Sequence, residues 1–99
     1  MFTVQLSPEF DGWLDALKDR TAQLRIANRL QRAEAGNLGD WKPITGSISE
    51  MRINTGPGYR LYFTRRDSLL IVMLAGGSKS TQARDIKRAQ AFLTQLDES

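Results

Sequence analysis

The chain contains no cysteine and no histidine among its 99 residues. Without cysteine it can form no disulfide, no thiolate metal site and no thiol nucleophile. Without histidine it lacks the usual general base near neutral pH, and a zinc site would have to consist of carboxylates alone. Any catalysis must therefore use arginine, lysine, tyrosine, aspartate or glutamate, and we expect neither a metal nor a small-molecule cofactor.

Long apolar runs are also missing. The longest, Leu69 to Ala75, is far too short to span a bilayer, and the start MFTVQLSPEF lacks the charged and apolar segments of a signal peptide. We therefore expect a cytoplasmic protein with no membrane partner. Hydrophobic residues make up 40% of the chain and charged residues 25%, which predicts one folded domain over residues 1–99 with no internal repeat.

Positive charge is concentrated in the second half of the chain. Residues 1–46 contain six basic and six acidic side chains, whereas residues 47–99 contain eight basic and five acidic ones and carry the whole net charge of +3. Within residues 52–88 the ratio is eight to two. This distribution suits a polyanionic partner, either nucleic acid or an acidic protein. A solvated surface with a mild basic bias explains the charge equally well.

The first half of the chain predicts a strand and two helices. Alternation over residues 2–6 indicates a short strand, and Ser7 followed by Pro8 predicts a helix start. Thr21 can cap a second helix, which Gly36 ends. The apolar stripes expected to pack on the sheet are Phe10, Trp13, Leu14 and Leu17 in the first helix, and Leu24, Ala27, Leu30 and Ala33 in the second. So short a link predicts an antiparallel helical hairpin.

Three arginines, Arg25, Arg29 and Arg32, recur along the polar side of the second predicted helix. They could contact a phosphate backbone, but such a row is more often a solvated helix face, and we favour that interpretation. The following residues, 36–46, contain three glycines and a proline. We expect them to form a loop.

Residues 49–63 predict a β-hairpin that turns at Gly56-Pro57-Gly58. Because side chains alternate along a strand, the apolar residues of this hairpin would face the core. The polar residues Glu50, Arg52, Arg60 and Tyr62 would lie together on the opposite face. The hairpin therefore presents a chemically active surface, around which the rest of the chain is organised.

The remaining residues predict a central strand and a last helix. Residues 69–75 are apolar without alternation, which indicates a strand covered on both faces. Residues 76–81 would leave this strand and cap a helix whose stripe is Ile86, Ala89, Leu93 and Leu96. The glycine-rich exit suggests phosphate binding at a helix N-terminus, although it is not a Walker A loop. The order β-α-α-β-β-β-α predicts an α+β fold, an antiparallel sheet with its helices largely on one face.

Four blocks of the sequence together resemble the RelE/ParE toxin superfamily, and specifically its HigB-like addiction module killer proteins. The blocks are Gly36-Asn37-Leu38-Gly39-Asp40, Ser49-Glu50-Met51-Arg52-Ile53, Gly56-Pro57-Gly58-Tyr59-Arg60-Leu61-Tyr62-Phe63, and Gly77-Ser78-Lys79-Ser80-Thr81-Gln82 with Asp85-Ile86 and Ala89. The resemblance implies a type II toxin that cleaves mRNA on the ribosome without a metal. It also implies a helix-turn-helix antitoxin as partner.

Internal cleavage of RNA requires cations for the phosphorane charge and groups that move protons. Under this resemblance the catalytic candidates are Arg60, Arg52, Lys79, Tyr62 and Glu50. In these roles Arg60 clamps the scissile phosphate, and Arg52 and Lys79 add positive charge. Tyr62 stacks on a base or donates a proton. Glu50 is the general base or orients an arginine. The RNA-binding candidates are Arg65, Arg66, Lys42, Gln82 and Arg84. Some relatives carry a late histidine or tyrosine, and this chain has neither after Tyr62.

Two other functions remain open at this point. One is a ParE-like inhibitor of DNA gyrase, which acts through protein contacts alone. The other is a non-enzymatic nucleic-acid-binding protein that works with its antitoxin as a repressor. Cations that converge on one face favour the endoribonuclease, because a gyrase inhibitor does not require them.

Overall fold

The computed structural model describes residues 1–98 and consists of a five-stranded sheet with three α-helices. In chain order the elements are β1 (Thr3–Leu6), α1 (Pro8–Ala16), α2 (Arg20–Glu34), β2 (Trp41–Thr45), β3 (Ile48–Ile53), β4 (Tyr59–Arg66), β5 (Leu70–Ser78), the 3-10 turn η1 (Lys79–Thr81) and α3 (Gln82–Glu98). The predicted α+β class is confirmed, and the predicted elements occur in the predicted order with one additional strand, β2, before the hairpin. No helix within residues 1–98 is long and apolar enough to cross a membrane.

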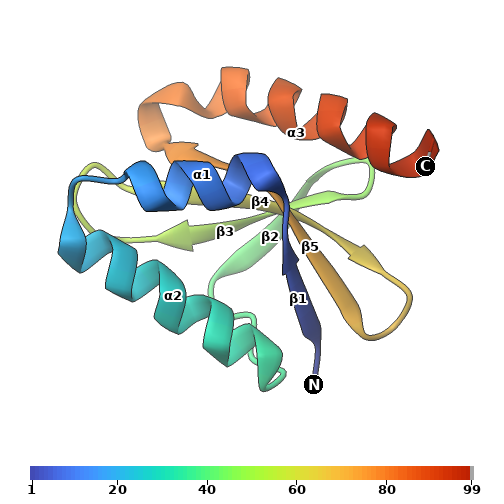
Figure 1. Cartoon of the computed structure of the whole chain (residues 1–99), viewed down its shortest axis with the longest axis horizontal. Coiled ribbons are helices and arrows are strands. Elements are labelled where there is room, and N and C mark those ends of the chain that lie inside the picture. Colours follow the sequence, from blue (N-terminus) through green and yellow to red (C-terminus); the bar gives the residue numbers. More distant parts are fainter. Residues whose placement is uncertain (99) are drawn as a thin grey trace.

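The strand order in the sheet is β1-β5-β4-β3-β2 (Figure 1). Strands β2 to β5 pair antiparallel, whereas β1 pairs parallel to β5, so the first and last strands of the chain are neighbours.

The expected loop over residues 36–46 is partly wrong, because Trp41–Thr45 forms the edge strand β2. Pro43 is tolerated there since an edge strand needs no N–H on its free side, and Trp41 packs on Phe63 with ring centroids 6.0 Å apart.

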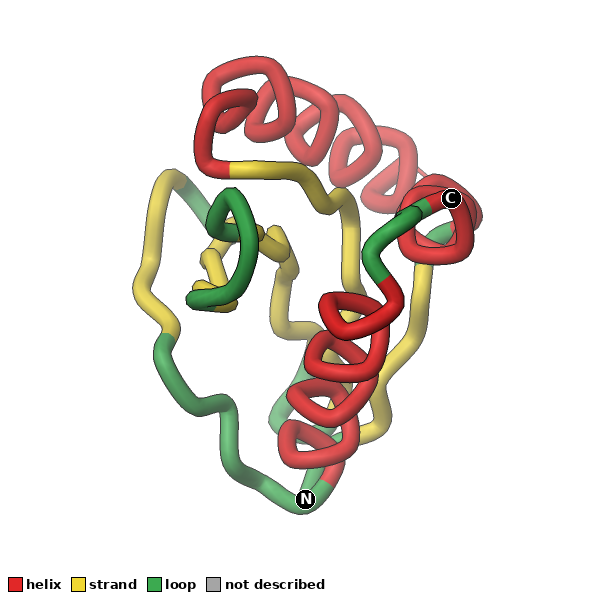
Figure 2. The backbone as a smooth tube through the Cα atoms, turned by 90° about the vertical axis from the view of Figure 1, so that its left-hand side faces the viewer, coloured by secondary structure: helices red, strands yellow, loops and turns green. Residues whose placement is uncertain are grey.

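Helices cover both faces of the sheet, which corrects the expectation that they lie largely on one. Helices α1 and α2 pack on one face over a cluster that includes Phe10, Ile26, Leu61 and Met73. Helix α3 covers the other face over a second cluster, which includes Tyr62. In Figures 1 and 2, α3 lies at the top of the molecule and α2 at the bottom. Helix α3 therefore covers the polar face of the β3–β4 hairpin.

The helix starts depend on two caps. The Ser7 side chain accepts a hydrogen bond from the backbone N–H of Phe10, with Pro8 in the first turn, as the sequence predicts. The cap of α2 is Asp19, which accepts from the N–H of Ala22, and not Thr21. The stripe predicted for α2 is half wrong: Ala22, Ile26, Leu30 and Ala33 are buried, and Leu24 is 64% exposed. Both sets of residues have helical spacing, and the set that contains the bulky Ile26 packs on the sheet.

Strand β5 contains a bulge that aims two consecutive side chains at α3. The pairing of β4 with β5 shifts after Tyr62, and Leu74 and Ala75 both join the cluster under α3. The strand continues to Ser78, so Gly76 and Gly77 lie inside it and not in an exit loop. Only glycine fits at Gly77, since a Cβ there would lie 1.8 Å from a carboxylate oxygen of Asp85.

Candidate active site

The register between β3 and β4 brings the predicted polar residues together. Glu50 lies opposite Tyr62, and Arg52 lies opposite Arg60. Directly paired residues of antiparallel strands point to the same face, and here that face is the one covered by α3. Met51 faces the other way, into the cluster beneath α1 and α2. The predicted division of the hairpin into an apolar and a polar face is confirmed.

Glu50 is the centre of this arrangement, although only 1% of its surface is exposed. Its Oε1 lies 3.3 Å from Nε of Arg52 and 3.7 Å from Nε of Arg60. Its Oε2 accepts a hydrogen bond of 2.9 Å from the side-chain amide of Gln82, at the start of α3. A buried carboxylate is costly unless it is paired and hydrogen-bonded, and these three partners meet that need.

Arg60 is held firmly but keeps much of its donor capacity. It is 8% exposed, and its Nη1 donates a 3.1 Å hydrogen bond to the carbonyl of Tyr59. Its Nε is buried without a hydrogen-bond partner within residues 1–98, since Glu50 is beyond hydrogen-bonding distance of it. A guanidinium has five N–H donors. One of these donors is paired in the structure, so an anion that reaches the exposed part of Arg60 can be bound without breaking that contact.

Lys79 reaches the same place through the turn of the hairpin. Its backbone N–H donates to the carbonyl of Gly58 at 2.6 Å. A Cβ on Gly58 would lie 3.6 Å from Cβ of Lys79 and 3.7 Å from Nη1 of Arg60, and the φ of 79° at this position favours glycine. The turn thus places the Cβ of the exposed Lys79 and the guanidinium of Arg60 around the same glycine. We call Glu50, Arg52, Arg60, Lys79 and Gln82 the β3–β4 site.

Tyr62 is completely buried, so in this conformation it cannot stack on a base. Its hydroxyl makes no hydrogen bond of good geometry to any residue from 1 to 98. Burial and the negative charge of Glu50 raise the pKa of Tyr62 to about 12, while the neighbouring amide of Gln82 acts weakly in the opposite direction. Tyr62 therefore forms the floor of the site and stays neutral at physiological pH.

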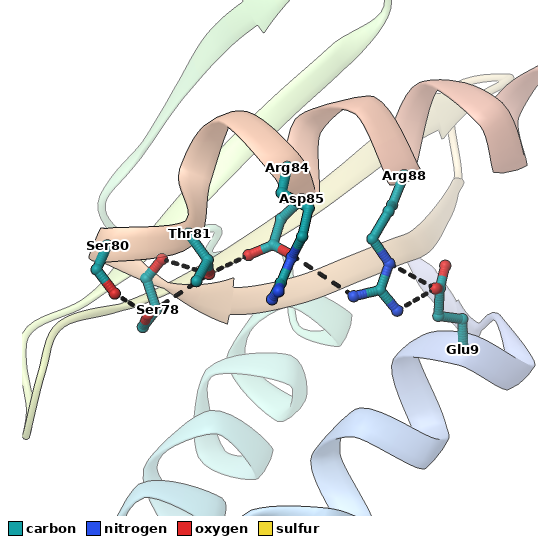
Figure 3. A network of polar contacts seen from close by, with 7 residues as sticks. All are labelled: Glu9, Ser78, Ser80, Thr81, Arg84, Asp85 and Arg88. Atoms are coloured by element: carbon teal, nitrogen blue, oxygen red, sulfur yellow. Dashed lines mark hydrogen bonds and ion pairs between the residues drawn. The ribbon is translucent and has the colours of Figure 1, made fainter.

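A polar network fixes the start of α3 over the sheet (Figure 3). Asp85 is fully buried, and its Oδ2 accepts a 2.5 Å hydrogen bond from the hydroxyl of Thr81, whose oxygen also lies 3.2 Å from the carbonyl of Ser78. Its Oδ1 lies 3.7 Å from Nη1 of Arg88, and Arg88 also pairs with Glu9 of α1. The network ties η1 and the first turn of α3 to β5 and to α1, and so sets the positions of the neighbouring Lys79 and Gln82.

The predicted RNA-binding residues do not form one group. Lys42 lies opposite Glu50 in the β2–β3 register and is exposed, and Gln82 belongs to the site. Arg84 is exposed and lies 3.5 Å from Asp85. Arg65 and Arg66 lie at the far end of β4, where the guanidinium of Arg65 stands 5.0 Å from the ring centroid of Phe2, and Arg66 pairs with Asp97. The structure thus separates Arg65 and Arg66 from the site.

Sequence reasoning missed the roles of Arg29 and Asp85. Arg29 is not simply solvated: Nη1 donates to the carbonyl of Arg52 at 2.6 Å, and Nη2 donates to the carbonyls of Leu38 and Asp40. Burial lowers its pKa, against the attraction of Asp40. A signal for Asp85 existed, because it lies four residues before Ala89 on the buried stripe of α3. Within residues 1–98, no three acidic residues gather as a metal site would require.

Comparisons with known proteins point to one family. Residues 12–94 match the family model described as phage derived protein Gp49-like (DUF891). The chain is also similar to an uncharacterized protein of Haemophilus influenzae, with 42% identity over 87 residues that cover 88% of each chain. No solved structure matches. The matched range includes the whole β3–β4 site and most of α3.

Proposed function

The chain belongs to the Gp49-like family of phage-derived proteins, which is associated with the toxins of toxin–antitoxin systems, and from this we propose that it is a toxin that cleaves mRNA on the ribosome. A toxin of such a system has an antitoxin as its partner. The ribosome, the message and the cleavage reaction are the parts that we propose. The HigB-like character of the chain is part of the same proposal.

One observation carries the proposal: two guanidinium groups share one buried carboxylate, and a third cationic residue starts from the adjoining hairpin turn. Arg52 and Arg60 lie opposite each other and share the carboxylate of Glu50, and the backbone of Lys79 is hydrogen-bonded to Gly58 in the turn of the hairpin. The group has an excess of positive charge even after Glu50 is counted. Guanidinium forks match the geometry of phosphate oxygens, so the scissile phosphate of an RNA is the ligand that fits the group best.

In the proposed reaction the 2′-oxygen of one nucleotide attacks the adjacent phosphorus as its proton leaves. The bond from phosphorus to the 5′-oxygen of the next nucleotide breaks, and that oxygen takes up a proton. The products are a 2′,3′-cyclic phosphate and a 5′-hydroxyl. Arg60 and Arg52 stabilise the charge of the phosphorane, with Lys79 as the third cation, and fixed donors of this kind supply a large part of such rate enhancements.

The remaining residues position the cations. Both oxygens of Glu50 already have partners, which favours an orienting role over that of a base. Gln82 connects α3 to this carboxylate, and Tyr62 supports the site from below. Lys42 extends the positive surface along β2, next to Glu50. The ribosome can supply much of the orientation of the message, which lowers the demand on the protein's own proton-transfer groups.

The test is cleavage of a defined message by the purified protein. We expect new 5′ ends on an mRNA bound in the ribosomal A site, no cleavage of the same mRNA without ribosomes, and 2′,3′-cyclic phosphate on the upstream fragment. Intact message after incubation with programmed ribosomes would contradict the proposal. In cells, pulse labelling separates this function from gyrase inhibition: amino-acid incorporation stops first in the proposed case, and DNA synthesis stops first in the other.

A further inference from the structure

We propose that the RNA strand held by the β3–β4 site continues around the free end of β3 into a second, arginine-lined binding site on the opposite face of the sheet. This inference deepens the proposed function, because it names a further contact to the same substrate. The second site is a hollow of about 320 Å³ between α2 and the end of β3, lined by Arg25, Asn28, Arg29, Arg32, Ile53 and Asn54. We call it the α2 hollow.

The charges of the α2 hollow are unbalanced. Arg25 and Arg32 are exposed and form no ion pair with any residue between 1 and 98. Burial lowers the pKa of Arg29, Asp40 acts against this, and the positive charge of Arg32 lowers the pKa further. Arg25 and Arg32 lack an acidic partner among residues 1–98, and such cations favour an anion near them. Their spacing along α2 is that of one helix face.

Arg29 makes the hollow a built feature and not a chance row of surface arginines. Its guanidinium is anchored to the carbonyls of Arg52, Leu38 and Asp40. Gly39 lies directly against this guanidinium, since a Cβ there would be 2.8 Å from Nη2 of Arg29. The loop before β2 thus folds around Arg29, and it leaves Arg25 and Arg32 on either side of a fixed positive centre.

The two sites meet at Arg52. Arg52 belongs to the β3–β4 site through its side chain, and its carbonyl accepts the hydrogen bond from Arg29. Strand β2 covers β3 only as far as the pair Trp41 and Met51, with one further bond from the N–H of Arg52 to Asp40. Ile53 and Asn54 therefore lie beyond the edge strand. An RNA backbone can pass from one face to the other at this point.

Single-stranded RNA fits the α2 hollow better than an acidic peptide segment does. Phosphates follow one another along the strand, and guanidinium forks bind phosphate oxygens in pairs. Asn28 and Asn54 add amide groups that can donate to and accept from a base edge. The volume of the hollow lies at the small end of the range for ligand sites, which suits one nucleotide.

The experiment measures binding of a short single-stranded RNA whose 2′-hydroxyls are methylated, so that it cannot be cleaved. Fluorescence anisotropy at several salt concentrations gives the affinity and its salt dependence. Each arginine that contacts a phosphate contributes a slope of about −0.7 in a plot of log affinity against log salt. We therefore expect Arg25→Ala and Arg32→Ala each to reduce the slope by that amount and the affinity about fivefold at roughly 0.1 M salt.

The matched control is Arg20→Ala, an exposed arginine on the same helix that does not line the α2 hollow. An equal loss of affinity in Arg20→Ala and Arg25→Ala would overturn the proposal, because it would mean diffuse attraction. Unchanged RNA affinity in Arg25→Ala and Arg32→Ala would overturn it as well, and lost binding of poly-glutamate in the same variants would then assign the hollow to a protein partner.

The outcome is independent of the proposed cleavage reaction. Binding is measured without ribosomes and without catalysis. The proposed RNA-binding site in the α2 hollow can therefore be supported even if the proposed cleavage reaction is rejected. Conversely, wild-type cleavage that depends on Arg60, together with normal RNA binding in Arg25→Ala and Arg32→Ala, would sustain the endoribonuclease and reject the hollow.

Discussion

The guanidinium of Arg60 lies 3.7 Å from the carboxylate of Glu50 and does not have that carboxylate to itself. The same oxygen is 3.3 Å from Arg52 on the neighbouring strand. One buried negative charge thus holds two positive charges at a fixed separation. Removing any of the three members leaves the others unbalanced, which makes this group the most informative target for substitution.

Replacing Arg60 by alanine should abolish toxicity and leave the protein folded. Loss of one preorganised donor typically costs on the order of 10²–10³ in rate, and Arg60→Lys should restore only part of it because an ammonium lacks the planar fork. The measurement is cleavage of ribosome-bound mRNA by folded, antitoxin-binding variants. Lys87→Ala, an exposed cation of α3 outside the site, is the control. Wild-type cleavage by Arg60→Ala would remove the β3–β4 site from consideration.

Glu50→Gln should separate binding from catalysis. The amide removes the negative charge that holds Arg52 and Arg60 in register but leaves the volume unchanged. We expect tighter binding of RNA, because the local charge becomes more positive, together with cleavage reduced at least tenfold, about 1.4 kcal/mol of transition-state stabilisation. Titration with uncleavable RNA and single-turnover kinetics measure the two effects. Cleavage at the wild-type rate would show that the two arginines need no orienting carboxylate.

The buried hydroxyl of Tyr62 predicts a loss of stability at high pH. The folded protein holds this proton up to about pH 12, whereas the unfolded chain releases it near the ordinary tyrosine pKa of 10.0. Above pH 10.0 the unfolded state binds fewer protons than the folded state, so the free energy of unfolding falls as the pH rises. The stability that depends on this proton is fully present below pH 10.0 and is lost towards about pH 12. Urea unfolding of the wild type and of Tyr62→Phe at several alkaline pH values checks this. The variant should show the smaller decline, and equal declines would contradict the prediction.

At neutral pH the same Tyr62→Phe variant should be no less stable than the wild type. The hydroxyl is buried without a good hydrogen bond to any described residue, and leaving such a group unsatisfied costs about 1–3 kcal/mol. Its removal should therefore be neutral or stabilising. Activity should also persist, because a neutral and buried phenol is a poor proton donor to an RNA. A large loss of cleavage in a stable Tyr62→Phe protein would return Tyr62 to the catalytic group.

The contact between Gly77 and Asp85 predicts a specific rescue. A Cβ at Gly77 would lie 1.8 Å from Oδ2 of Asp85, so Gly77→Ala should be destabilised by about 1–3 kcal/mol, the usual cost of overpacking a well-packed site. The double variant with Asp85→Ala should recover part of that loss, since it opens the space. A thermal-unfolding mutant cycle measures the coupling. Gly12→Ala, where no atom lies within 4 Å, should be neutral or slightly stabilised; simple additivity at Gly77 and Asp85 would contradict the steric explanation.

The sequence predicted what depends on neighbouring residues and missed what depends on distant ones. Alternation along residues 49–63 was enough to place Glu50, Arg52 and Arg60 on one face, because side-chain direction in a strand is local. Neither the burial of that face beneath α3 nor the pairing of β1 with β5 has a local signal. Strand β2 was not predicted from the sequence because Pro43 and the surrounding glycines are typical of loops. The anchoring role of Arg29 depends on three carbonyls that only the tertiary fold brings together.

The parallel pairing of β1 with β5 has a consequence for the order in which the protein is made. Strand β1 can pair with β5 only when residues 70–73 have been synthesised. The β3–β4 site lacks Gln82 and the helix that covers it until α3 has emerged from the ribosome. Domains generally fold as units during synthesis, so we expect a growing chain to be harmless to the ribosome that makes it and to the message it is made from. Chains released early, after Ser78, should accordingly be inert in the cleavage assay, and only the release of nearly the whole chain should start its activity.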